Sequence, residues 1–160
     1  MMKKSFNKIM LVSLCDKWTS QVAYVLSQKL GMMFCDIKDL LEYDLSEKQA
    51  MEDLCSPEYV KKREKAVIKR YLSFENVVSS VESDVFLHNK EFEAESNYII
   101  FLNVPNEFTQ KNGSAINVIT LDSRKKILKE SADVCISIRK TDEDFVSEKI
   151  IEKLREILWT

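Results

Sequence analysis

Short, wholly apolar runs alternate along this chain with longer segments in which apolar residues recur every three or four positions. Residues 9–12 are such a run and predict a strand that is buried on both faces of a sheet. Between Val22 and Leu30 the apolar spacing is that of one helix face, and Gly31 follows where helices often end in a left-handed residue. Residues 32–35 predict a second buried strand.

The same alternation continues to the end of the chain. Pro57 suits the first turn of a helix. Asp122 or Ser123 is expected to cap another helix, which runs to Glu130. Further elements are expected as strands at 77–78, 98–102 and 134–138 and as a last helix at 142–158. This alternation predicts an α/β fold with a mainly parallel sheet and helices on both faces, and the chain is long enough for one domain spanning residues 1–160.

The loop after the first strand has the place of a phosphate-binding loop but lacks its residues. Such a loop needs two glycines, a lysine and a Ser or Thr in the spacing G-x-x-x-x-G-K-[ST]. In the window 13–20, Ser13 and Trp18 stand where the glycines belong. Thr19 stands where the lysine belongs, and only Ser20 fits the pattern. The motif is therefore degenerate, and from its residues alone the window is a strand-to-helix connection.

Two charged residues in this window bear on its chemistry. Asp16 would place a negative charge beside a bound phosphate. Lys17 lies two positions before the place of the motif's lysine, so it is not a simple replacement. Either Thr19 or Ser20 is expected to cap the helix that follows, because a hydroxyl oxygen can accept a hydrogen bond from a first-turn N–H.

Landmarks along nearly the whole chain resemble those of shikimate kinases, in the same order and with similar spacing. They are Ala23, Leu26 and Leu30-Gly31 in the first helix, then residues 34–38, 41–42, 60–64, 76–83, 99–105 and 124–133. The resemblance implies a three-layer α/β/α fold with five strands in the order 2-3-1-4-5. It also implies that residues 106–123 are a shortened form of the family's mobile lid.

The resemblance also assigns ligand-site positions, several of which carry other residues. Asp36 matches the family's aspartate on the magnesium side. Lys38 stands where the family has a second aspartate that holds the substrate, and Lys61 stands where it has a substrate-binding arginine. Lys61 keeps the charge but loses the planar fork that grips a carboxylate. Arg124 matches a substrate-contacting arginine directly.

Two functions follow from this mixture of kept and lost landmarks. The first is a pseudoenzyme, a catalytically inactive binding or regulatory module on a kinase scaffold, with no cofactor. The second is a divergent, active shikimate kinase or related ATP-dependent small-molecule kinase that uses Mg-ATP. In that case Lys17 or Lys38 would replace the missing lysine, Ser20 and Asp36 would hold Mg²⁺, and Arg124 would contact substrate.

A third hypothesis keeps the pocket for a different ligand. Lys38, Lys61 and Arg124 would then form a basic trio that binds a small anionic ligand. Three unrelated surface charges explain the same residues equally well. A protein partner is the other expected ligand class, because a module without catalysis still needs something to bind.

Composition excludes several other classes. A formal net charge of −2 gives no general attraction to nucleic acid or to an anionic membrane. The chain has only 2 glycines, where average usage would give about eleven, and this argues against a working phosphate loop. No apolar run approaches the length of a membrane span.

Cysteine usage bears on metal binding and location. The cysteines at 15, 35, 55 and 135 show no C-x-x-C spacing, and His88 is the only histidine, so no metal site is expected. Cys35 and Cys135 fall in predicted strands, which is typical of buried, reduced thiols. These features favour a cytoplasmic protein.

Overall fold

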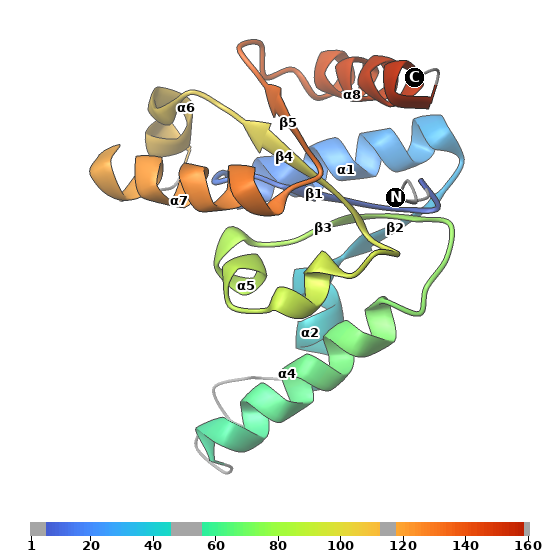
Figure 1. Ribbon diagram of the computed structural model, residues 1–160, viewed down its shortest axis with the longest axis vertical. Coiled ribbons are helices and arrows are strands. Elements are labelled where there is room, and N and C mark those ends of the chain that lie inside the picture. Colours follow the sequence, from blue (N-terminus) through green and yellow to red (C-terminus); the bar gives the residue numbers. More distant parts are fainter. Residues whose placement is uncertain (1–5, 46–55, 113–117, 159–160) are drawn as a thin grey trace.

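Five parallel strands form one sheet in this computed structural model, which describes residues 6–45, 56–112 and 118–158 (Figure 1). The strand order β2-β3-β1-β4-β5 confirms the order expected from the resemblance. The elements are β1 Lys8–Val12, α1 Asp16–Leu30, β2 Met33–Asp36, α2 Ile37–Leu45, α4 Pro57–Tyr71, β3 Val77–Ser80, α5 Ser83–Leu87, the 3-10 helix η1 Lys90–Glu93, β4 Tyr98–Asn103, α6 Asn106–Lys111, α7 Val118–Ser131, β5 Val134–Ser137 and α8 Glu143–Leu158.

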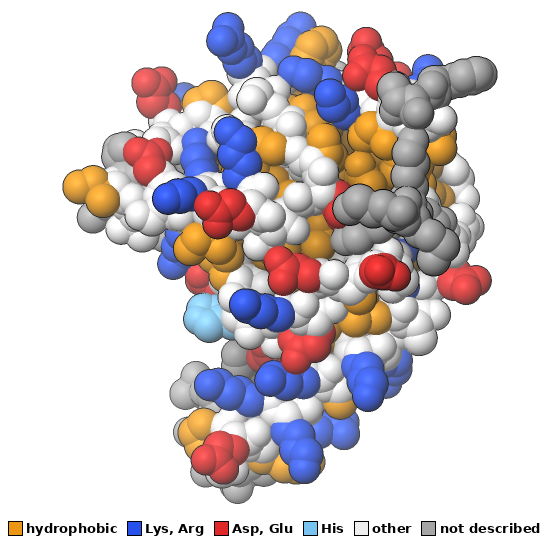
Figure 2. Space-filling view, viewed as in Figure 1, with side chains coloured by type: hydrophobic (Ala, Val, Ile, Leu, Met, Phe, Trp, Pro, Cys, Tyr) orange, Lys and Arg blue, Asp and Glu red, His pale blue; other side chains and the backbone are white. Residues whose placement is uncertain are grey.

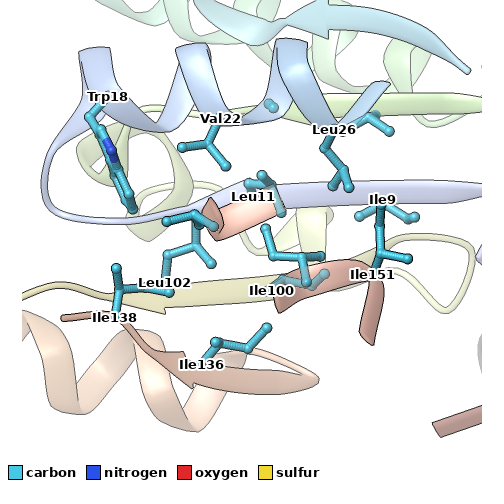
Figure 3. Packing of buried hydrophobic residues seen from close by; sticks show 14 of the residues in the cluster. Ile9, Leu11, Trp18, Val22, Leu26, Ile100, Leu102, Ile136, Ile138 and Ile151 are labelled. Carbon is cyan, nitrogen blue, oxygen red and sulfur yellow. The ribbon is translucent and has the colours of Figure 1, made fainter. Parts of the chain in front are cut away.

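Helices cover both faces of the sheet and bury a core on each side. Side chains alternate along β1, so Ile9 and Leu11 pack toward α1 and α8 (Figure 3). Met10 and Val12 pack toward the opposite layer, which contains α2, α4, α5 and α7. All four of these residues are buried, as the predicted two-sided strand requires. The three-layer α/β/α architecture is therefore confirmed.

The first helix begins earlier than expected. α1 starts at Asp16, with Cys15 as its cap residue, so the predicted capping by Thr19 or Ser20 is wrong. The Thr19 hydroxyl is buried and donates back to the Cys15 carbonyl oxygen at 3.0 Å, inside the first turn. The end of this helix is as predicted, since Gly31 has the left-handed φ of 66°.

The segment expected as a lid contains helices. α6 covers Asn106–Lys111, residues 113–117 lie outside the described part of the chain, and α7 begins at Val118. The expected start of this helix at Asp122 or Ser123 is therefore wrong by about one turn. Leu121, which is buried against the sheet, favours the longer helix because it belongs to its apolar face.

A buried polar cluster fixes α4 to the sheet. The Tyr71 hydroxyl lies 2.6 Å from Ser79 Oγ on β3 and donates to Asn97 Oδ1 at 3.3 Å. Asn97 Nδ2 in turn donates to the Phe92 carbonyl oxygen at 2.8 Å. Each member has a partner, as burial demands. The cluster holds in place the helix that carries Lys61.

Candidate functional site

The carboxyl ends of β1, β3 and β4 form the edge of the sheet where ligands bind in open α/β folds. From β1 the chain runs to β2 and β3 on one side and later to β4 and β5 on the other, so the strand order reverses at β1. Crevices at such a point are the usual ligand sites of these folds. The β1–α1 loop lies at this point, and the first turn of α1 is bonded to Ser83 at the start of α5 and to Thr141 before α8.

Polar groups of the β1–α1 loop satisfy one another. Ser13 Oγ accepts a hydrogen bond from the Cys15 N–H at 3.0 Å and lies 2.5 Å from Thr19 Oγ1. The Thr19 N–H also donates to the Cys15 carbonyl oxygen, at 3.0 Å. Ser13 and Thr19 are fully buried. Ser13 and Thr19, which stand at the positions of a glycine and the lysine of the motif, therefore form their hydrogen bonds within the loop and the first turn of α1.

Helix α1 begins inside the window that corresponds to the phosphate-binding motif. Residues 16–20 of the window 13–20 are helical. A phosphate-binding loop instead wraps its backbone N–H groups around the phosphate before the helix starts. Here the Thr19 N–H is already part of the helical hydrogen-bond ladder. The described backbone does not fit the phosphates of a nucleotide in the way the motif does.

Asp16 joins the start of α1 to the start of α5. Its Oδ1 accepts a hydrogen bond from the Ser83 N–H at 2.9 Å. Burial raises the pKa of this carboxyl to about 6, the Ser83 hydrogen bonds oppose the rise in part, and the charges of Glu82 and Asp84 add to it. A carboxylate held where its charge is disfavoured is typical of a functional site or of a former one.

Trp18 closes the gap between the β1–α1 loop and the β5–α8 loop. Its indole Nε1 donates to the Thr141 carbonyl oxygen at 2.8 Å. Its ring packs edge-on against Phe108 of α6, with centroids 5.7 Å apart, and only 5% of the residue is exposed. Figure 3 shows Trp18 pointing from the start of α1 into the core layer. A groove of about 460 Å³ remains outside Trp18, and the exposed Lys17 lines it.

Ser20 and Asp36 are brought together, as the magnesium hypothesis requires. Ser20 Oγ donates to Asp36 Oδ2 at 3.1 Å, and the other carboxylate oxygen accepts from the Lys38 N–H at 3.1 Å. Hydroxyl and carboxylate oxygens suit Mg²⁺, which usually completes its shell with water and substrate phosphates. The oxygen pair thus fits Mg²⁺ in part, but the neighbouring loop does not fit the phosphates that would share the ion.

The three basic residues assigned to a ligand pocket have different surroundings. Arg124 on α7 forms an ion pair with Asp84, 2.8 Å from Nη1 to Oδ1. Lys61, Asp84 and His88 line a groove of about 390 Å³ between α4 and α5. Figure 2 shows this hollow beside the single histidine, with acidic and basic side chains interspersed around it. Lys38, exposed at the start of α2, is not among the residues that line this groove.

Sequence reasoning missed the partners of the degenerate loop. Ser83, Asp84 and Thr141 are far from the window in sequence, and the resemblance identified only a lost glycine turn at residues 81–83. The clustering of Glu82 and Asp84 where that turn stood was the available signal. Within the described residues, no group of three or more His, Cys, Asp or Glu side chains is arranged to hold a metal ion.

Searches by sequence find no relative: the chain matches no family model and no curated protein. Its topology and ligand edge define the class to which it is similar, the P-loop small-molecule kinases with a five-stranded parallel sheet.

The thiols of Cys15, Cys35 and Cys135 are free, and Cys35 and Cys135 are half-buried. No helix in the described part of the chain is long and apolar enough to cross a membrane.

Solved structures identify the particular fold as shikimate-kinase-like. Shikimate kinase from Aquifex aeolicus vf5 has a TM-score of 0.73 and 22% sequence identity, over 95% of this chain and 98% of that one. Shikimate kinase from Bacteroides thetaiotaomicron has a TM-score of 0.75 and 15% identity, over 96% and 99%. Shikimate kinase from Acinetobacter baumannii in complex with shikimate has a TM-score of 0.70 and 18% sequence identity, over 96% of this chain and 95% of that one. At these identities the likeness establishes the fold alone.

Proposed function

We propose that this chain is a shikimate-kinase-like pseudoenzyme, a binding or regulatory module that does not transfer phosphate. The observation that carries the proposal is the start of α1 at Asp16, which makes residues 16–20 of the phosphate-loop window helical. Phosphoryl transfer depends almost wholly on positioning and charge stabilisation around the phosphates. A chain that lacks the loop's backbone cradle and its lysine lacks the groups that supply both.

Two further contacts support the proposal. The Asp16 carboxylate, bound to the Ser83 N–H, adds negative charge beside the position of a phosphate. Trp18 fills the approach with a buried ring whose N–H is bound to Thr141. Loss of the cradle and the lysine together is expected to lower the rate of transfer by about a thousandfold or more.

The test is a turnover assay with Mg-ATP and shikimate. The proposal predicts no activity above background. The alternative, a divergent active kinase, rests on one observation, the 3.1 Å hydrogen bond from Ser20 to Asp36 where Mg²⁺ would be held. It predicts turnover that falls in Lys17→Ala or Lys38→Ala, because one of these lysines would have to replace the missing one. Activity that neither variant changes would reject this form of the alternative.

The groove between α4 and α5 supports a ligand-binding role for the module. Lys61, Lys65 and His88 line it together with Glu64 and Asp84, and apolar side chains of Val60 and Val85 form part of its wall. A small anionic ligand such as shikimate suits this mixture of charge and apolar surface. Binding should weaken about tenfold in Lys61→Ala, whereas Lys69→Ala on the same helix serves as the matched control. Equal affinities in both variants would remove Lys61 from the site.

Partners and cellular location are proposed on the following grounds. A protein partner is the other ligand class that we propose for a module of this kind. We expect neither nucleic acid nor membrane as a partner, since the net charge of −2 favours neither. The cytoplasm is the expected location, and cell fractionation would test it.

A further inference from the structure

A further groove lies beside the window 13–20, on the side of α1 that faces the start of α8. It has a volume of about 660 Å³ and is bounded by α1, by Phe34 of β2 and by the residues that lead into α8. Ser20, Tyr24 and Val25 line it from α1. None of its lining residues belongs to the groove between α4 and α5, but Gln21, Asp142 and Glu143 also line the groove outside Trp18.

The wall of this groove carries aromatic surface that is open to solvent. Tyr24 is 52% exposed. Its ring contacts Phe34 edge-on, with centroids 5.6 Å apart and planes at 86°. Because the two rings hold each other in place, they offer a rigid apolar surface that loses little entropy when a partner packs on it.

The opposite rim of the groove is acidic. Asp142, Glu143 and Asp144 line it in succession. Asp142 caps α8, since its Oδ1 accepts from the Phe145 N–H at 3.0 Å. The position of Glu143 and Asp144 in the first turn also suits the helix dipole. Helix capping therefore explains why Asp142 is acidic, but it does not explain why aromatic rings lie across the groove from these charges.

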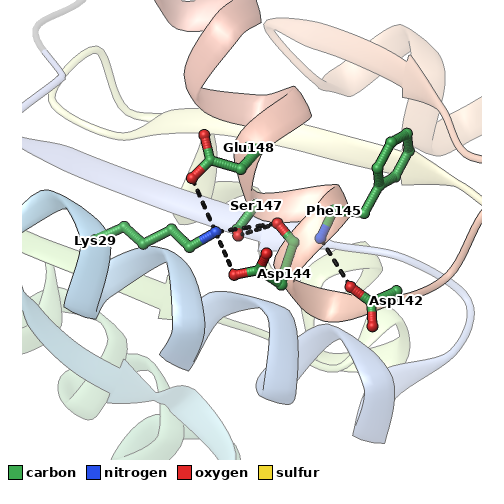
Figure 4. A network of polar contacts seen from close by, with 6 residues as sticks. All are labelled: Lys29, Asp142, Asp144, Phe145, Ser147 and Glu148. Carbon is green, nitrogen blue, oxygen red and sulfur yellow. Dashed lines mark hydrogen bonds and ion pairs between the residues drawn. The ribbon is translucent and has the colours of Figure 1, made fainter.

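Lysines near this rim compensate part of its negative charge, and the exposed Lys17 lines the adjoining groove together with Asp142 and Glu143. Lys29 lies between Asp144 and Glu148, with Nζ–O distances of 2.7 and 3.0 Å (Figure 4). Lys140 lies over the Phe145 ring, 4.9 Å from its centroid. Glu143 has no ion-pair partner within the part of the chain that the structure describes.

We infer that this groove binds a basic segment of a partner protein, with Lys or Arg side chains on the acidic rim and one apolar residue against Tyr24 and Phe34. Charge complementarity to Asp142 and Glu143 selects the basic side chains. The exposed aromatic pair selects the apolar anchor, and the ring faces also attract cations. The inference deepens the proposed function, since it names the class of partner for a binding module, but its evidence is separate from the phosphate loop.

The test is fluorescence anisotropy with the full chain and a labelled peptide of sequence Lys-Arg-Lys-Leu-Trp-Arg-Lys-Arg. We expect saturable binding that weakens as salt is added, because the rim charges are exposed. Glu143→Lys should weaken binding by about tenfold or more. Glu152→Lys makes the same charge reversal on α8 outside this groove and should change affinity by less than about twofold.

Two further controls separate the groove from general charge attraction. Tyr24→Ser should weaken binding, whereas Tyr59→Ser, at an aromatic residue that is 46% exposed on α4, should not. A peptide with alanine in place of Leu and Trp should bind more weakly than the parent peptide. Thermal unfolding of each variant shows that its fold is kept.

Several results would overturn the inference. They are the absence of saturable binding, an equal loss in Glu143→Lys and Glu152→Lys, and equal binding of the alanine-substituted peptide. Self-association of the protein that is lost in Glu143→Lys would assign the groove to a second copy instead. Turnover with Mg-ATP alongside intact peptide binding would refute the proposed function and leave the groove's assignment standing.

Discussion

The two halves of the ligand edge use their polar groups differently. On the β1 side, Ser13 and Thr19 bind the loop to itself, Asp16 binds Ser83, and Trp18 fills the remaining gap. On the α4–α5 side, a groove of about 390 Å³ stays open beside Lys61. In the β1 half the groove of about 460 Å³ lies outside the buried Trp18 ring and the self-bonded loop, whereas Lys61 lines the α4–α5 groove directly.

This difference shows what a fold requires and what its chemistry requires. The sheet and its helices depend on apolar pattern and packing, which many sequences satisfy. A phosphate loop depends on backbone N–H groups left without internal partners. In this chain Ser13 accepts from the Cys15 N–H and Asp16 accepts from the Ser83 N–H, so these two N–H groups have partners within the protein.

The largest expected effect comes from Trp18, if the β1 half is part of the core. Trp18→Ala removes a 5% exposed ring and its hydrogen bond to Thr141. The free energy of unfolding should fall by about 3–5 kcal/mol, measured by urea denaturation. Tyr59→Ala, on a 46% exposed aromatic residue, should cost less than about 1 kcal/mol. If Trp18→Ala lowered the free energy of unfolding as little as Tyr59→Ala does, the β1 half would not be tightly packed.

Removing the charge of Asp16 should raise the free energy of unfolding, by less than the loss of Trp18 lowers it. Its folded-state pKa of about 6 lies above the usual 3.8, so the folded protein binds the proton more tightly than the unfolded chain does. The stability that this proton contributes is fully present below about pH 4 and is lost as the pH rises to about 6. At neutral pH the ionised carboxylate therefore costs stability.

Asp16→Asn tests this sign, because the amide oxygen can still accept from the Ser83 N–H while the charge is gone. The variant should be more stable by about 1–2 kcal/mol at pH 7, a value reduced from the full shift because the carboxyl is partly solvated. Its stability should also vary less between pH 4 and 6 than that of the parent. Asp39→Asn, at an exposed position on α2, is the control. A variant less stable than the parent at pH 7 would contradict the burial argument.

The smallest effect is expected in the open half. Arg124→Gln breaks the pair with Asp84, whose side chain is 64% exposed. The loss should be about 0–1 kcal/mol and should shrink further in high salt, as thermal unfolding would show. Lys126→Gln, also on α7 and exposed, provides the matched control. A loss above about 2 kcal/mol would mean that the Arg124–Asp84 pair holds this half closed.

Much of the fold could be predicted from the chain, because buried strands and amphipathic helices carry their own periodic signals. β1 and the left-handed Gly31 are where the pattern places them. The strand order came from the resemblance to a family, since periodicity cannot order strands. The start of α1 was missed because Thr19 looks like a helix cap in sequence, and its burial became visible only in three dimensions.

The site was less accessible to sequence reasoning. The absence of the motif's glycines and lysine could be read from the sequence, but the contacts that the window residues make are long-range. The hydrogen bond from Ser83 to Asp16 spans 67 residues, and that from Trp18 to Thr141 spans 123. No local pattern encodes such pairs, because each residue also suits an ordinary turn or helix start.

The central claim is that the β1 half no longer accepts phosphate. Calorimetric titration with Mg-ATP and with Mg-ADP, each with and without shikimate, tests it most directly. The account predicts no heat of binding and no thermal stabilisation at millimolar nucleotide. Nucleotide binding at micromolar concentration would contradict it, because the Asp16–Ser83 and Trp18–Thr141 contacts would then have to open to admit a ligand.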